Sequence, residues 1–195
     1  MADTASVAAK VGGKVIVITG GARGIGLATA TALHKLGAKV AIGDIDETTV
    51  KESGADLGLE VYGRLDVTDP ASFSDFLDQV ERQLGPIDVL INNAGIMPVG
   101  RIIDEPDAVT RRILDINVYG VILGSKLAAQ RMVPRNRGHV INVASLAPGN
   151  CTSSGWPPTL PASTPCWHSP TRPGWSTART VCTSRPCCRP SSTPN

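Results

Sequence analysis

From residue 15 the chain runs Val15-Ile16-Val17-Ile18-Thr19-Gly20-Gly21-Ala22-Arg23-Gly24-Ile25-Gly26, an apolar β-branched run that ends in a glycine-rich turn. The run lacks polar alternation, so it predicts a strand buried on both faces. The glycines let the backbone turn tightly and approach a ligand closely. An amphipathic helix pattern follows, and the N–H groups and positive dipole end of such a helix favour a phosphate. A plain strand-to-helix turn is the alternative explanation of this stretch taken alone.

Strand and helix patterns alternate along the first three quarters of the chain, after a short, mobile lead-in expected at residues 1–13. This alternation predicts an α/β fold with a doubly wound parallel sheet. A ligand of such a sheet binds beyond the carboxyl ends of the strands. The residues expected there are Thr19, Asp44, Asp66, Asn92 and Ser145. The strands are expected at 14–19, 39–43, 61–65, 87–91 and 139–143, and the helices at 24–36, 48–57, 70–84 and 107–132.

Two helices carry apolar stripes that predict their buried faces. The first helix is expected to bury Ile25, Ala28, Leu33 and Leu36. In the helix that begins at Pro70, Asp69 is expected to cap the N-terminus. The apolar residues on one face of that helix are Phe73, Phe76, Leu77, Val80 and Leu84.

The glycine pattern Thr19-Gly20-x-x-x-Gly24-x-Gly26 resembles the cofactor loop of the short-chain dehydrogenase/reductase family. Asn92-Asn93-Ala94-Gly95, after an apolar strand, resembles the family's N-N-A-G signature, in which an Asn amide ties neighbouring strand ends together. The resemblance implies a Rossmann-type sheet and hydride transfer between an alcohol or ketone and NAD(P). It covers residues 12 to about 147. The cofactor-binding residues that it implies are Thr19, Gly20, Arg23, Gly24, Ile25, Gly26, Asp44, Asp66, Val67, Asn93, Ala94 and Gly95.

Asp44 lies at the end of the second strand, where a carboxylate can accept hydrogen bonds from the ribose hydroxyls and repel a 2′-phosphate. Arg23 favours NADP instead, because its guanidinium can pair with the 2′-phosphate. We expect NAD rather than NADP as the cofactor from the position of Asp44. Asp66, with Val67 beside it, matches the family residue that contacts the adenine amino group. The alternatives are a turn residue for Asp44 and a helix-capping loop for Asp66.

Two catalytic residues follow from the resemblance. Asn117, in the family's N-x-x-G segment, matches the asparagine that bends the long helix and holds a water on the proton path; an Asn on a solvated face is the alternative. Ser145 matches the serine that hydrogen-bonds the substrate oxygen where charge develops. The family then requires a Tyr about 13 residues later and a Lys four after that, but these positions are Pro158 and Ala162. In the family the lysine lowers the pKa of the tyrosine phenol, so that the tyrosine can exchange a proton with the substrate. Because positions 158 and 162 are Pro and Ala, this chain lacks that proton-transfer pair.

Composition changes abruptly near Ala147. All 17 acidic residues lie at or before Asp115, whereas all five Cys, all three Trp and most of the 15 Pro lie in residues 148–195. Only Leu160 and Val181 are large aliphatic residues there, so this tail cannot bury a core and is expected to be disordered. We therefore divide the chain into a partial NAD(P)-binding domain, 1–147, whose sheet is truncated after the fifth strand, and a tail, 148–195.

The tail has the composition of a GC-rich gene translated out of frame. Joining the third base of each codon to the first two of the next lets residues 156–166 encode ATYLASKHAV. The tyrosine codon then spans Pro158 and Thr159, and the lysine codon spans Ala162 and Ser163. We infer a frameshift near Ala147 or Pro148. The alternatives are a genuine Pro/Ser/Thr-rich disordered tail and a Cys/His metal site, and the Cys spacing argues against the metal.

The net charge of +2 gives no electrostatic case for nucleic acid or membrane binding. Met1-Ala2-Asp3-Thr4 lacks the pattern of a secretory signal, so we expect a cytoplasmic protein without metal. The predicted function is NAD(P)-dependent oxidation or reduction of a small-molecule alcohol or ketone, with this chain inactive for want of the Tyr-x-x-x-Lys pair. The alternative is a non-catalytic nucleotide-binding remnant or an unstable frameshift product. Family members are usually homo-oligomers, which we doubt for this chain because the tyrosine-bearing helix is lost.

Overall fold

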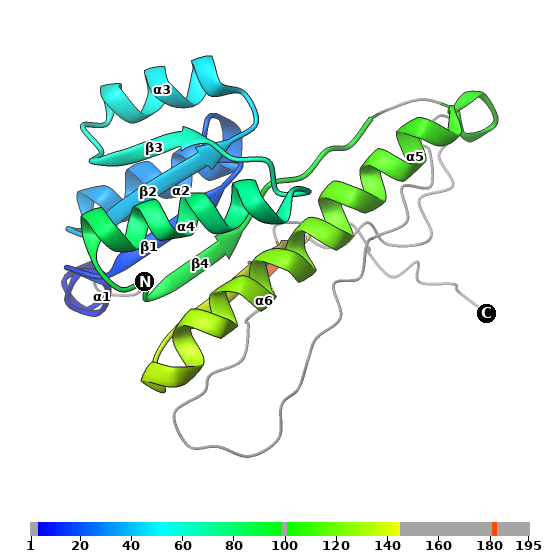
Figure 1. The fold of residues 1–195 in the computed structure, drawn as a ribbon. Coiled ribbons are helices and arrows are strands. Elements are labelled where there is room, and N and C mark those ends of the chain that lie inside the picture. Colours follow the sequence, from blue (N-terminus) through cyan, green and yellow to red (C-terminus); the bar gives the residue numbers. More distant parts are fainter. Residues whose placement is uncertain (1–3, 99–100, 145–180, 183–195) are drawn as a thin grey trace, which may run out of the picture.

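The computed structural model describes residues 4–98, 101–144 and 181–182. Its centre is a parallel sheet with the strand order β3-β2-β1-β4-β5-β6. Strands β1 to β4 are labelled in Figure 1. The order reverses between β3 and β4, because the chain crosses from one edge of the sheet back to the middle. This is the doubly wound topology expected from the sequence, and it places a ligand-binding crevice at the switch point. The strands are β1 (Val15–Thr19), β2 (Lys39–Asp44), β3 (Val61–Arg64), β4 (Val89–Asn92), β5 (His139–Ala144) and β6 (Val181–Cys182).

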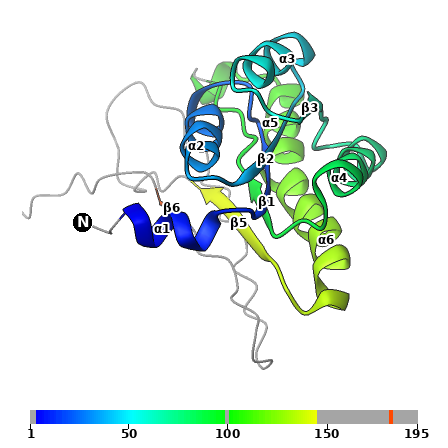
Figure 2. The ribbon, with the colours of Figure 1, turned by 90° about the vertical axis from the view of Figure 1, so that its left-hand side faces the viewer.

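Helices cover both faces of the sheet (Figure 2). The pair α2 (Gly24–Lys35) and α3 (Glu47–Asp56) lies on one face, and α4 (Pro70–Leu84) and α6 (Val121–Met132) lie on the other. Between α5 (Asp107–Leu114) and α6, a π-helical segment, η2 (Asp115–Gly120), completes one long continuous helix. The shorter elements are α1 (Thr4–Val11) and the 3₁₀ turns η1 (Ile102–Asp104) and η3 (Val133–Arg135).

Strand β1 divides the hydrophobic core into two clusters. Val15 and Val17 pack with α4 and α6, whereas Ile16 and Ile18 pack on the side of α2 and α3. Every residue of β1 is buried. The run lacks polar alternation because both faces of this central strand are covered, and this confirms the prediction of a strand buried on both faces.

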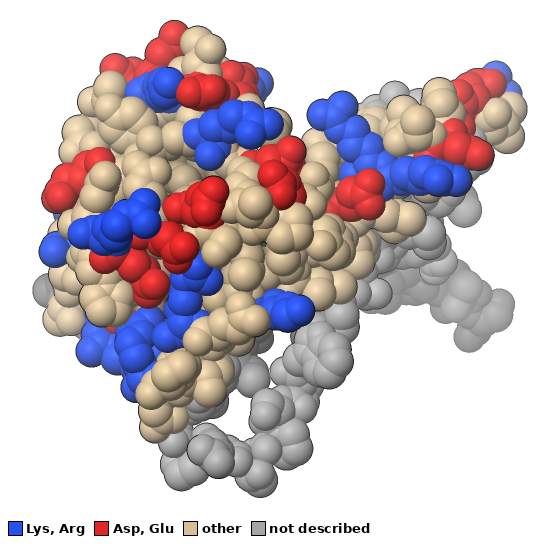
Figure 3. Space-filling view, viewed as in Figure 1, with Lys and Arg blue, Asp and Glu red and all other residues tan. Residues whose placement is uncertain are grey.

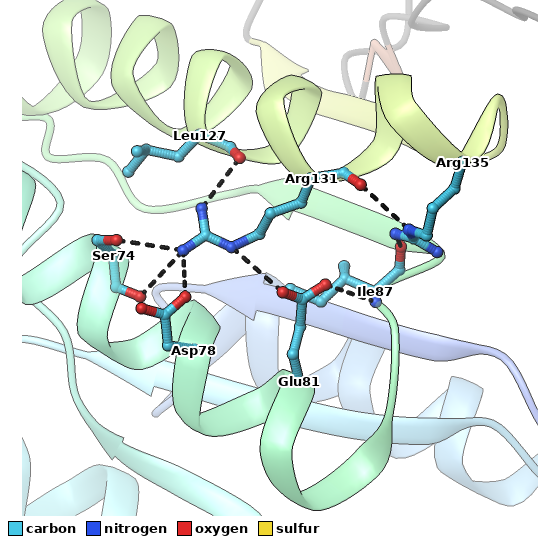
Figure 4. Close-up of polar contacts among 7 residues, drawn as sticks. All are labelled: Ser74, Asp78, Glu81, Ile87, Leu127, Arg131 and Arg135. Atoms are coloured by element: carbon cyan, nitrogen blue, oxygen red, sulfur yellow. Dashed lines mark hydrogen bonds and ion pairs between the residues drawn. The ribbon is translucent and has the colours of Figure 1, made fainter.

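Helix α4 has the boundaries and the buried face that its sequence predicts. The Asp69 side chain accepts a hydrogen bond from Ala71 N (2.9 Å), and Pro70 begins the helix. All five apolar residues of the expected face are buried. Arg131 of α6 fastens the polar side of this helix, with Nε 3.4 Å from Glu81 Oε2 and Nη2 bonded to Asp78 and to Ser74 Oγ (Figure 4).

Three expectations differ from the structure. The lead-in, for which the sequence predicted no secondary structure, contains the helix α1, and the two-residue strand β6 continues the sheet beyond β5. The stripe of α2 is displaced: Ile25 is 54% exposed and Ala28 is exposed, whereas Gly26 and Ala30 are buried. Small residues face the sheet because Gly26 lies directly against the backbone of Gly20, so the larger Ile25 is turned toward the crevice.

The last long strand is less well covered than the first. Residues Val140 to Ala144 of β5 are all half-buried, in contrast to the fully buried β1. Helix α6 packs against β4 and β5 on one face. On the other face Ile141 and Val143 extend the cluster of Ile16 and Ile18 but are only partly buried.

Candidate functional site

The carboxyl ends of the strands surround one cavity of about 600 Å³. The strand registers place Thr19 beside Gly43 and Asp44 beside Arg64, so these ends lie at one edge of the sheet. This volume is in the range of small-molecule and cofactor pockets. The residues that line the cavity are Gly20, Arg23, Ile25, Asp44, Ile45, Leu65, Asp66, Val67, Thr68, Asn93, Ala94, Gly95, Ile96, Arg112, Asp115 and Ile116.

The glycine loop lines the cavity through Gly20, Arg23 and Ile25, whereas Gly24 and Gly26, which were also expected to bind the cofactor, are not among the lining residues. The geometry requires glycine at positions 20, 24 and 26. Gly20 and Gly24 have φ angles of +66° and +57°, which residues other than glycine rarely adopt. A Cβ atom on Gly26 would lie 2.1 Å from the carbonyl oxygen of Gly20. Among the described residues no side chain caps the N-terminus of α2, so its first N–H groups remain suited to a phosphate.

Thr19 and Asn93 hold the loop after β1 against the loop after β4. The buried Thr19 hydroxyl accepts hydrogen bonds from the backbone N–H groups of Asn93 and Ala94, both at 3.0 Å. Asn93 Nδ2 donates in return to the carbonyl oxygens of Thr19 and Gly20, also at 3.0 Å. Thr19 is 1% exposed and does not line the cavity, so its side chain assembles the site from behind.

Asn92 ties the next pair of strands together. Its Nδ2 donates to Asn142 Oδ1 on β5 (2.9 Å) and to Ser125 Oγ on α6 (3.2 Å). The helix can approach this closely because residue 124 is a glycine, on which a Cβ would lie 2.4 Å from Asn92 Oδ1. The buried amide thus fixes β4, β5 and α6 relative to one another.

Asp44 stands at the end of β2 with its carboxylate oriented by the backbone. Oδ2 accepts from Ala22 N and Oδ1 accepts from Asp46 N, each at 3.1 Å. The side chain is half-buried and lines the cavity together with Ile45, which is 51% exposed. A carboxylate held in this way, next to an exposed apolar side chain, suits the hydroxyls and base of a nucleoside.

Arg23 lines the same end of the cavity, where its guanidinium is paired with Asp46. Asp46 caps α3, with Oδ1 accepting from Thr49 N at 3.1 Å and Oδ2 accepting from Thr49 Oγ1 at 2.8 Å. These hydrogen bonds, first the one from the Thr49 backbone N–H, hold the pKa of Asp46 below its ordinary value, and the charge of Arg23 acts in the same direction. Asp46 is therefore ionised at neutral pH.

Asp66 follows β3 and faces the other end of the cavity. Its Oδ1 accepts from Thr68 Oγ1 (2.7 Å) and Thr68 N (3.0 Å). The Thr68 hydroxyl contributes most to lowering the pKa of Asp66, and the charges of Arg64 and Arg112 lower it further. The carboxylate is thus a fixed acceptor, which fits the amino group of an adenine.

Asn117 lies in the π-helical segment η2, so the long helix changes its geometry at this residue. The Asn117 side chain bonds the backbone of Ile96 twice, through Nδ2 to the carbonyl oxygen and through Oδ1 to the N–H. A Cβ on Gly95 would lie 3.3 Å from Asn117 Oδ1, so a larger residue would be tightly placed against this side chain. Ser145, the other catalytic residue expected, lies outside the described residues.

Several lining residues were not singled out from the sequence. Leu65 and Thr68 flank the expected Asp66-Val67 pair, and Ile45 follows Asp44 directly. Their adjacency in sequence to expected site residues could have predicted that they line the cavity. Arg112, Asp115 and Ile116 come from α5 and η2, on an arm that extends away from the sheet (Figure 1). Lys and Arg lie next to Asp and Glu along this arm (Figure 3), and nothing in its local sequence indicates a cavity wall.

A model of the family described as short chain dehydrogenase matches residues 14–157. The chain is 40% identical over 135 residues to the 3-alpha-(or 20-beta)-hydroxysteroid dehydrogenase of Mycobacterium tuberculosis, covering 69% of this chain and 52% of that protein. It is 38% identical over 141 residues to the probable oxidoreductase EphD of the same organism, covering 70% of this chain and 24% of that protein. A crystal structure of a short-chain type dehydrogenase/reductase from Mycobacterium marinum superimposes with a TM-score of 0.64 at 36% identity, covering 69% of this chain and 57% of that one.

These similarities and the doubly wound sheet identify the chain as a member of the short-chain dehydrogenase/reductase family. Its homologues are oxidoreductases, and the family uses NAD(P). The chain spans about a quarter to a half of the length of these curated relatives.

The structure gives two further findings about the described residues. None of their helices is both long and apolar enough to span a membrane. No group of three or more His, Cys, Asp or Glu side chains within 4–98, 101–144 and 181–182 is arranged to hold a metal ion.

Proposed function

We propose that this chain binds a nicotinamide adenine dinucleotide, with NAD preferred to NADP, in the cavity at the carboxyl ends of β1 to β4. The glycine loop and the uncapped N-terminus of α2 would hold the pyrophosphate, and Asp66 would bind the adenine amino group. The observation that carries the proposal is the close approach of Gly26 to Gly20, because it holds the N-terminus of α2 against the loop that follows β1, at the edge of the cavity. When bound, the nicotinamide of such a cofactor supplies the hydride acceptor or donor.

The preference for NAD rests on Asp44. Its carboxylate is held toward the cavity by the N–H groups of Ala22 and Asp46, so it can accept hydrogen bonds from both ribose hydroxyls. A 2′-phosphate in the same place would meet a fixed negative charge. Calorimetry should therefore give a lower Kd for NAD than for NADP. Asp44→Asn keeps the shape of the side chain and should narrow the ratio of the two Kd values by about fivefold, since two like charges about 4 Å apart in water repel each other by about 1 kcal/mol.

We further propose that the chain as written does not turn over an alcohol or ketone. It has no Tyr after Tyr119 and no Lys after Lys126, so it lacks the phenol and ammonium that the family uses for proton transfer. Loss of a general acid or base costs about 10² to 10⁴ in rate. The test is an assay of NAD reduction with a panel of secondary alcohols, run on protein that calorimetry has shown to bind NAD. Turnover in that panel would overturn this part of the proposal.

The active enzyme is, in this proposal, the protein translated in the other frame after about residue 147. Sequencing the source DNA across codons 140–165 would show whether a base has been miscounted. The frame-corrected protein should then oxidise or reduce a small-molecule alcohol or ketone, with Ser145 and Asn117 in the catalytic roles implied by the family. If that protein shows no turnover of any alcohol or ketone in the panel and does not bind NAD, the dehydrogenase assignment is contradicted.

The remaining expectations belong to the same proposal. Residues 1–147 would form the dinucleotide-binding domain and 148–195 a tail outside it, in a cytoplasmic protein. Limited proteolysis with mass spectrometry tests the division, because cleavage should concentrate after residue 147 and NAD should protect residues 14–144. Protection that extends evenly to the C-terminus would contradict it.

A further inference from the structure

We propose that Asp46 is a specificity-determining residue that holds Arg23 away from the 2′-position of the bound dinucleotide. This inference rests on the function proposed above and deepens it. Two residues at the same end of the cavity favour different cofactors. Asp44 favours NAD, whereas Arg23 favours NADP because it can bind a phosphate. The pairing of Arg23 with Asp46 resolves this conflict in favour of NAD.

The geometry of Asp46 makes it a fixed partner instead of a mobile surface carboxylate. Both of its oxygens are oriented by Thr49, one through the backbone N–H and one through the hydroxyl. The Arg23 guanidinium bonds Oδ2, the oxygen that also accepts from the Thr49 hydroxyl. Arg23 itself is 67% exposed, so little else restrains it.

Asp46 also acts on Asp44 through its own backbone. Its N–H donates to Asp44 Oδ1 at 3.1 Å, so the turn that presents the Asp46 carboxylate to Arg23 also aims Asp44 at the cavity. In this proposal the turn has two effects. It orients the Asp44 carboxylate, which binds the ribose, and it forms the ion pair with the Arg23 guanidinium, which would otherwise bind a 2′-phosphate. A freed guanidinium would form charge-assisted hydrogen bonds with a phosphate, for which arginine is well suited.

The test compares Asp46→Asn with Glu47→Gln. Asparagine still caps a helix N-terminus and keeps the backbone N–H that holds Asp44. The substitution removes the negative charge that pairs with Arg23 and replaces one of the two acceptor oxygens with a donating NH2 group. Glu47 is the adjacent residue of α3 and pairs with Lys51 instead, with Oε1 2.7 Å from Nζ. Glu47→Gln therefore removes one negative charge from the same turn without freeing Arg23.

The readout is the Kd for NAD and for NADP measured by calorimetry, with the ratio of the two as the result. We expect Asp46→Asn to shift this ratio about fivefold toward NADP, the size expected when an exposed ion pair no longer competes. Glu47→Gln should shift it by less than twofold. In the background Arg23→Ala, Asp46→Asn should lose its effect, because no guanidinium remains to be freed.

Each outcome is decisive. Equal shifts in Asp46→Asn and Glu47→Gln would overturn the inference in favour of a general charge effect. A shift that persists in the Arg23→Ala background would overturn it too. No binding of either dinucleotide by the unsubstituted chain would instead contradict the proposed function itself. A thermal melt of each variant confirms that α3 has kept its cap.

Discussion

The side chain of Asn117 forms two hydrogen bonds of 2.9 Å with the backbone of Ile96, donating to its carbonyl oxygen and accepting from its N–H. This paired contact joins the π-helical segment η2 to the loop that follows β4. Because Ile96 and Ile116 both line the cavity, the contact fixes the distance between two of its walls.

Asn117→Ala should destabilise the chain by about 1 to 3 kcal/mol, because it leaves the half-buried N–H and C=O of Ile96 without their partners. Urea unfolding followed by circular dichroism measures this change. Gln130→Ala is the control, since residue 130 is exposed on α6 of the same long helix. Equal midpoints for the two variants would mean that water replaces the amide at no cost.

Gly26→Ala should abolish dinucleotide binding and destabilise the fold by about 1 to 3 kcal/mol, the usual cost of overpacking. The new Cβ would lie 2.1 Å from the Gly20 carbonyl, so α2 must move away from the loop. Gly63→Ala on β3 is the matched control, because a Cβ there meets nothing within 4 Å. Calorimetry with NAD and a thermal melt give both quantities, and an unchanged Kd in Gly26→Ala would refute the proposed phosphate cradle.

Arg131→Lys should cost about 1 to 2 kcal/mol of stability, since lysine has one charged nitrogen where the arginine fork reaches Ser74, Asp78 and Glu81 together. The arginine side chain is only 15% exposed, so water does not readily replace these bonds. Arg82→Lys makes the same change at an exposed position of α4. Denaturant unfolding should separate the two variants, and a loss of stability in Arg82→Lys as large as in Arg131→Lys would contradict the role of the network.

Asp66 should make stability depend on pH in the acid range. Its pKa is lower in the folded chain than in the unfolded one, mainly because the Thr68 hydroxyl donates to it. The stabilisation is therefore complete above the unfolded pKa of about 4 and is lost as the pH falls through the folded pKa. Thr68→Val should reduce the difference between the melting temperatures at pH 7 and pH 3. Thr29→Val, at a hydroxyl that bonds the carbonyl of Ile25 instead, should leave that difference unchanged.

Much of the fold could be predicted from the sequence because its periodic signals are strong. The continuous apolar run of β1 and the stripe of α4 each demand a particular environment, and the structure has both. In α2 the prediction was wrong for Ile25 and Ala28, although Leu33 packs against the core as expected, because periodicity counts apolar residues without regard to their neighbours. The close approach of Gly26 to Gly20 leaves no room for a larger side chain there, and this selected the small face of the helix.

The site was predictable where residues follow strand ends and unpredictable where they come from a distant helix. Asp44 and Asp66 lie at the cavity because parallel strands end at one edge. The cavity side of α5 was not predictable from the sequence, since it depends on where this arm lies relative to the strand ends. The pairing of Arg23 with Asp46 was also out of reach, because it joins residues 23 positions apart through the turn that begins α3.

Among the residues that the structure describes, those that line the cavity run from Gly20 to Ile116, whereas the half-buried strand β5 begins only at His139. During synthesis this described lining is therefore translated before the ribosome reaches β5. A ligand that binds only the folded lining stabilises it in proportion to the logarithm of its concentration. A dinucleotide bound as proposed would therefore stabilise the part of the chain that is made first, through lining residues that include none from β5.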